Sequence, residues 1–189
     1  MNIPKNAGLL DKVIYPIVNI FVPYFFKYGV TPNMVTTITL VIRLIVIYNL
    51  YYKRNYALII FLFIISWFTD CVDGQLARNY NMKSEFGGIY DVVVDIVSSF
   101  FIFVILYFIY YKKKKKSIII FFVILCFIIL LGIIKSKCFI TNDGKVLEKG
   151  IRNIKLDIPC DFFRFVKIYD ESCNYLVIVI FLVYTLFFY

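Results

Sequence analysis

Long apolar runs alternate with short polar breaks along most of this chain. Each of the first four runs is close to or above the roughly 20 residues that an α-helix needs to cross the hydrocarbon core of a bilayer. A fifth run is shorter. The pattern predicts an all-α membrane protein whose spans are residues 34–52, 56–80, 86–111, 117–136 and 174–189.

Two segments do not fit a span. Residues 8–29 mix charged side chains and prolines with large apolar ones, which suits an interfacial amphipathic helix better than a crossing. Thr31, Pro32 and Asn33 then predict a break followed by a helix start. Residues 137–173 are too charged to cross and predict a polar loop with short strands or an interfacial helix. We therefore expect one membrane domain over residues 1–189: a polytopic helix bundle with about five to six transmembrane helices.

Composition supports a membrane location. The 189 residues are 62% hydrophobic, whereas soluble domains are nearer 45 to 50% apolar. The net charge of +9 lies mostly in short loops, where it fits topology control and contact with anionic lipid better than nucleic-acid binding. Thirteen of the 21 Lys and Arg fall on one side of the predicted spans and seven on the other, with Arg43 inside a span. The positive-inside rule makes the first side, which holds the N-terminus and residues 81–85, cytoplasmic.

The residues that are missing exclude several kinds of chemistry. Histidine is absent, which removes histidine general bases, histidine metal ligands and serine–histidine triads. Five cysteines are scattered without paired spacing and indicate neither a disulfide framework nor a zinc site. The N-terminus shows no signal-peptide pattern. Proton chemistry must then use carboxylates, Lys, Tyr or Cys.

Four aspartates interrupt the apolar runs at Asp70, Asp73, Asp91 and Asp95. An Asp at the centre of a membrane helix costs about 2.5 to 3.5 kcal/mol, so these four need compensation. The first two are three residues apart and the last two are four apart, which places each pair on one face of its helix. If residues 79–87 form the turn between antiparallel spans, all four carboxylates converge. Buried structural ion pairs, a catalytically inactive scaffold or the cation path of a transporter would also place carboxylates here.

Carboxylates that share one site repel each other unless a cation compensates them. Oxygen ligands suit Mg²⁺ or Mn²⁺, which commonly bind carboxylates together with substrate phosphates. Such an ion beside Arg78 could hold a diphosphate. Gly74, Ala77 and Gly87 remove side-chain bulk near the aspartates, which would admit a nucleotide but is equally typical of plain helix packing.

The spacing of these residues resembles the signature of the CDP-alcohol phosphatidyltransferases (class I). All eight fixed positions match: Asp70-x2-Asp73-Gly74-x2-Ala77-Arg78-x8-Gly87-x3-Asp91-x3-Asp95. The interfacial helix and the Thr-Pro-Asn entry to the first span are also similar to the family, up to about residue 136. Six spans are usual there, whereas this sequence predicts five, with the polar segment 137–173 in the place of another.

The resemblance implies an enzyme of phospholipid biosynthesis. It would transfer a phosphatidyl group from a CDP-linked lipid, usually CDP-diacylglycerol, to a small alcohol and release CMP. It implies that Asp70, Asp73, Asp91 and Asp95 hold two Mg²⁺ or Mn²⁺ ions and that Asp95 is the general base. Arg78 would serve the phosphates, and Gly74, Ala77 and Gly87 would line the substrate pocket. The active site would face the cytoplasm, the partners would be membrane lipids rather than nucleic acid, and a homodimer would suit exposed spans.

Overall fold

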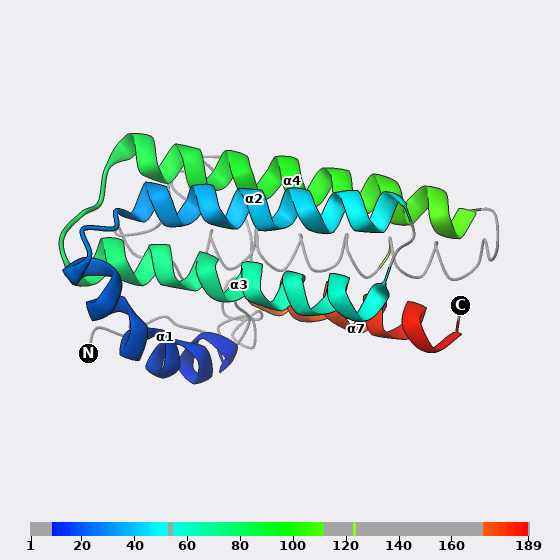
Figure 1. Cartoon of the computed structure of the whole chain (residues 1–189), viewed down its shortest axis with the longest axis horizontal. Coiled ribbons are helices and arrows are strands. Elements are labelled where there is room, and N and C mark those ends of the chain that lie inside the picture. The colour runs from blue at the N-terminus through cyan, green and yellow to red at the C-terminus, as the bar shows by residue number, and fades with distance from the viewer. Residues whose placement is uncertain (1–8, 53–54, 112–122, 124–171, 189) are drawn as a thin grey trace, which may run out of the picture.

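The computed structural model describes residues 9–52, 55–111, 123 and 172–188, and every regular element among them is an α-helix (Figure 1). This confirms the all-α expectation for the described part of the chain. The helices, in chain order, are α1 (Leu9–Lys27), α2 (Pro32–Tyr51), α3 (Tyr56–Asn79), α4 (Glu85–Tyr111) and α7 (Ser172–Phe188).

Three of these helices are long and apolar enough to cross a membrane. They cover Pro32–Tyr51, Tyr56–Asn79 and Glu85–Ile109, which confirms the first three predicted spans. The chain is accordingly an integral membrane protein. The predicted span 117–136 lies outside the described residues except for Val123, as does the polar segment 137–173 except for its last two residues, which already belong to α7. With 17 residues, α7 agrees with the short last element that the sequence predicts.

The predicted helix starts are built from local caps. Thr31 caps α2, since its hydroxyl accepts a hydrogen bond from the backbone N–H of Met34 at 3.4 Å, and Pro32 follows in the first turn. Pro there sacrifices no helical hydrogen bond. Asn55 caps α3 by accepting from the N–H groups of Ala57 and Leu58. Both caps satisfy amide groups that a helix start otherwise leaves without partners.

Helix α2 packs against both α3 and α4 and lies between them in Figure 1. Few direct contacts join α3 to α4. The two helices that carry the aspartates are therefore not packed directly on each other, as a simple hairpin would have them. Side chains of α2 can therefore reach both helices that carry the aspartates.

Two apolar clusters hold the described helices together. One unites α2, α3, α4 and α7 and includes the buried side chains Phe63, Leu106 and Leu182. The other packs α1 on the aspartate-bearing half of α3, where Val18 and Val22 belong to one buried cluster with Cys71, Val72 and Leu76. The predicted helix at residues 8–29 is confirmed as α1, with Pro16 and Pro23 inside it. The ring of Phe26 at its end stacks on Tyr80, with centroids 3.8 Å apart.

Candidate metal centre

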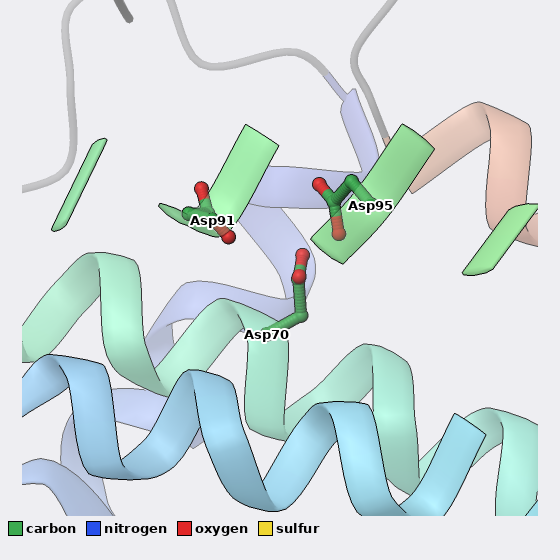
Figure 2. A group of neighbouring side chains, drawn as sticks. All are labelled: Asp70, Asp91 and Asp95. Atoms are coloured by element: carbon green, nitrogen blue, oxygen red, sulfur yellow. The ribbon is translucent and has the colours of Figure 1, made fainter. Parts of the chain in front are cut away.

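Three carboxylates come together from the second half of α3 and the first half of α4. Asp70 on α3 and Asp91 and Asp95 on α4 each offer an oxygen, and these three oxygens lie within 4.8 Å of one another. Figure 2 shows the side chains pointing toward a common centre. All three residues are half-buried. Because Asp91 and Asp95 are one turn apart, they share a face of α4, as their spacing predicts.

The fourth aspartate has a different environment. Asp73 is buried, and its Oδ2 accepts a hydrogen bond of 2.7 Å from the hydroxyl of Thr36 on α2. The same hydroxyl is 3.1 Å from the carbonyl oxygen of Pro32, one turn earlier. Asp73 is not in the group of three oxygens. The structure thus brings Asp70, Asp91 and Asp95 together and holds Asp73 against α2.

An arginine of α2 lies between two of these carboxylates. Arg43 of α2 donates from Nη2 to Asp70 Oδ1 at 3.1 Å and from Nη1 to Asp95 Oδ1 at 2.5 Å. Only 1% of its surface is exposed, which makes it the one buried cationic residue in the part of the chain that the structure describes. The sequence holds the signal for it, an arginine inside an apolar run. Charged residues in membrane helices usually pair with one another or mark functional sites.

Two neutral groups complete the surroundings of Arg43. Its Nη1 donates to Ser98 Oγ at 3.2 Å, one turn beyond Asp95 on α4. Its Nη2 donates to the hydroxyl of Tyr175 on α7, and the guanidinium carbon lies 5.4 Å from the centre of the Tyr175 ring. One guanidinium therefore contacts α3, α4 and α7 from α2. Tyr175 brings the C-terminal helix to the candidate site.

Three other predicted site residues, Gly74, Ala77 and Arg78, lie in the last turns of α3. Arg78 lies over the ring of Tyr15 of α1, with 5.4 Å from the guanidinium carbon to the ring centre. A Cβ added at Gly74 would lie 3.0 Å from a terminal nitrogen of Arg78, so the absence of a side chain there gives room to the guanidinium. Ala77 is half-buried in the same turn of α3.

Gly87 marks a close contact between helix starts. A Cβ at this position would lie 2.7 Å from Asn33 Oδ1 and 2.8 Å from Ser84 Oγ. Real Cβ atoms do not approach other atoms that closely, so Gly87 allows the first turn of α4 to pack beside α2. Helix packing therefore accounts for the glycine at this position, as its small size suggested. The predicted contact of Gly87 with substrate remains a prediction.

A family model described as CDP-alcohol phosphatidyltransferase matches residues 29–188, most of the chain. The chain belongs to the CDP-alcohol phosphatidyltransferase family. Two curated proteins are also similar. An uncharacterized protein of Aquifex aeolicus (strain VF5) is 35% identical over 85 residues, 45% of this chain and 41% of that protein. The archaetidylinositol phosphate synthase of Pyrococcus horikoshii is 37% identical over 70 residues, 37% of each chain.

The matched stretches thus span about two fifths of the length of each relative. No solved structure matches this chain. Membership in the family confirms the resemblance that the aspartate signature predicts. The signature residues Asp70 to Asp95 fall within the part that the family model covers.

The three converging carboxylates offer the kind of ligand that suits a hard divalent ion. Carboxylate oxygens are the ligands that Mg²⁺ and Mn²⁺ prefer. Around one octahedral ion with metal–oxygen distances of about 2.1 Å, neighbouring ligand oxygens are about 3.0 Å apart and opposite ones about 4.2 Å. The three oxygens lie within 4.8 Å of one another. Asp70, Asp91 and Asp95 would therefore have to move closer together to share one metal ion.

Proposed function

We propose that this protein transfers a phosphatidyl or related phosphate-linked group from a CDP-linked lipid, with CDP-diacylglycerol as the favoured donor, to an alcohol, and releases CMP. The observation that carries the proposal is the convergence of Asp70, Asp91 and Asp95 from two helices of a CDP-alcohol phosphatidyltransferase. A structural ion pair or a cation path would account for the carboxylates alone. Neither would require Gly74, Ala77 and Arg78 at the spacing of the family signature.

In the proposed reaction, the acceptor oxygen forms a bond to the lipid-side phosphorus of the diphosphate. The bond from that phosphorus to the bridging oxygen breaks, and CMP leaves with the electron pair. Asp95 takes the proton of the acceptor hydroxyl. Its side chain is 27% exposed despite the contact with Arg43, so an acceptor can reach the carboxylate. A base within hydrogen-bond reach of a hydroxyl typically contributes a factor of 10² to 10⁴ to the rate.

The four aspartates of the signature, Asp70, Asp73, Asp91 and Asp95, would hold divalent metal, Mg²⁺ or Mn²⁺. Bound metal would neutralise negative charge on the diphosphate and on the departing CMP. Thr36 orients the Asp73 carboxylate by its hydrogen bond. Arg78 would add positive charge beside the phosphates, and Gly74 and Ala77 would leave space for the nucleotide next to it. The stack of Arg78 on Tyr15 gives α1 a part in placing this charge.

The acceptor alcohol is to be identified by testing several candidate compounds. One relative is named archaetidylinositol phosphate synthase, so an inositol phosphate belongs among these candidates beside serine, inositol and glycerol phosphate. Tyr175 places α7 next to Asp95, which supports a role of the C-terminal part in acceptor choice. The charge distribution supports an active site that faces the cytoplasm. A homodimer stays a prediction, to be tested by cross-linking in membranes.

The test uses purified full-length protein in detergent with CDP-diacylglycerol, Mg²⁺ or Mn²⁺, and each acceptor in turn. We expect CMP to form with at least one acceptor, to depend on the metal, and to be lost in Asp95→Asn. The matched control is Glu85→Gln, because Glu85 is an exposed carboxylate on the same helix, outside the group of three. CMP release by Asp95→Asn at the rate of the control would contradict the general-base role. No CMP with any acceptor, also with CDP-choline or CDP-ethanolamine as donor, would contradict the transfer itself.

A further inference from the structure

We propose that Arg43 takes the place of one of the two divalent ions that the family resemblance implies, so that this protein holds a single metal ion beside a resident guanidinium. The inference rests on the proposed function, since it concerns the same aspartates. It begins from the packing of the helices. Helix α2 lies between α3 and α4, and Arg43 reaches from α2 to one carboxylate of each.

The contacts of Arg43 are those of a bridging cation. One nitrogen donates to Asp70 of α3 at 3.1 Å and the other to Asp95 of α4 at 2.5 Å. A metal ion shared by these two carboxylates would join the same two helices through the same two residues. A guanidinium, whose two terminal nitrogens form a fixed fork, can do this without any added ion and keeps its charge at all physiological pH values.

The surroundings fix Arg43 in this position. It is 1% exposed, so it has no path to water that would not disrupt the bundle. Ser98 and Tyr175 accept its further hydrogen bonds, which gives the guanidinium partners on three helices. A side chain held in this way is part of the site rather than a flexible surface group that an arriving ion could displace.

The charge of Arg43 opposes a second divalent ion between the two carboxylates that it contacts. A second divalent ion bridging Asp70 and Asp95 would lie next to the buried guanidinium, and like charges in a region of low dielectric repel strongly.

The experiment counts ions in the full-length protein purified in detergent. Mn²⁺ is titrated into the wild-type protein and into Arg43→Gln and Arg43→Lys. Bound Mn²⁺ is measured by equilibrium dialysis, and electron paramagnetic resonance distinguishes an isolated ion from a spin-coupled pair. We expect one Mn²⁺ per wild-type chain with the spectrum of an isolated ion. Arg43→Lys, which keeps the charge, should also bind one ion, whereas Arg43→Gln should bind two that are spin-coupled.

A coupled pair of ions in the wild-type protein would overturn the inference, and so would a single ion in a folded Arg43→Gln protein. If Arg43→Gln does not fold, as judged by circular dichroism and size-exclusion chromatography, the wild-type count decides alone. CMP release by a wild-type protein that holds two coupled ions would overturn this inference and leave the proposed function standing. A protein that binds no Mn²⁺ and releases no CMP would contradict both.

Discussion

The hydroxyl of Thr36 donates a hydrogen bond of 2.7 Å to the carboxylate of Asp73, and both side chains are buried at the contact between α2 and α3. This bond gives the second aspartate of the family signature a fixed partner on the first membrane span. Asp73 is not one of the three carboxylates that form the converging group.

Replacing Thr36 by Val should destabilise the protein. The substitution keeps the shape of the side chain but leaves the buried Asp73 oxygen without this donor, which costs about 1 to 3 kcal/mol. The matched control is Thr37→Val, because Thr37 is exposed and bonds Asn33 and Tyr90 instead. Thermal unfolding in detergent measures the difference between the two variants. Equal unfolding temperatures would show that the Thr36 bond does not support Asp73.

Gly87 should tolerate alanine poorly. The added Cβ would meet Asn33 Oδ1 at 2.7 Å and Ser84 Oγ at 2.8 Å, and overpacking of this kind typically costs about 1 to 3 kcal/mol. Gly74→Ala is the comparison, since its Cβ would meet only the flexible end of Arg78. We expect Gly87→Ala to lower the unfolding temperature more than Gly74→Ala does. The reverse order would mean that the starts of α2 and α4 are not packed as described.

The pair Gly87→Ala with Ser84→Ala extends this test. Removing the Ser84 hydroxyl relieves one of the two close approaches but also removes the hydrogen bond that it accepts from the N–H of Gly87 at 3.0 Å, so the double variant should be more stable than the sum of the two single losses predicts. If the two single losses of stability simply add in the double variant, the Ser84 hydroxyl does not cause the strain.

Tyr175→Phe should impair catalysis more than it impairs folding. The change removes the hydroxyl that accepts from Arg43 and lies 3.5 Å from Asp95 Oδ1, while the ring can still pack against Phe63 and Trp67. We expect a several-fold lower kcat for CMP release with a small change in unfolding temperature. The control is Tyr51→Phe, an exposed tyrosine at the far end of α2. Unchanged turnover in Tyr175→Phe would show that the Tyr175 hydroxyl of α7 has no role in catalysis.

Metal should stabilise the folded protein as well as activate it. A ligand that binds only the folded state adds about 2.7 kcal/mol at a concentration of 100 times its Kd. We expect Mg²⁺ or Mn²⁺ to raise the unfolding temperature of the wild-type protein and EDTA to reverse the effect. The rise should be largely lost in Asp91→Asn, because that change removes one of the three converging carboxylates. The same rise in Asp91→Asn would place the metal elsewhere.

The sequence was sufficient for the three long spans, the helix start at Thr31 and the family, because each rests on a local pattern or a fixed spacing. It also predicted that aspartates from two helices meet, and the structure brings Asp70 to Asp91 and Asp95. What it could not supply is the arrangement of neighbours. The position of α2 between α3 and α4 sets Arg43 beside Asp70 and Asp95 and sets Thr36 beside Asp73.

The arginine that contacts two of the aspartates is distant from them in the sequence. Arg78 is close to the aspartates in sequence, but it lies over Tyr15 at the end of α3. Arg43 is 27 residues from Asp70 and 52 from Asp95, and only the packing of α2 reveals the contacts. Tyr175 is more distant still in the chain. Such pairings depend on tertiary structure, which no local pattern contains.

The most direct test of the central claim follows phosphorus through the reaction. Phosphorus-31 NMR of the full-length protein with CDP-diacylglycerol, Mg²⁺ and the acceptor that supports CMP release resolves the diphosphate, CMP and the new phosphodiester. Transfer to the acceptor predicts that CMP and the phosphodiester appear in equal amounts, only when metal and acceptor are both present, and not in Asp95→Asn. A diphosphate signal that persists in the presence of metal and every acceptor, or CMP without any phosphodiester, would contradict the account.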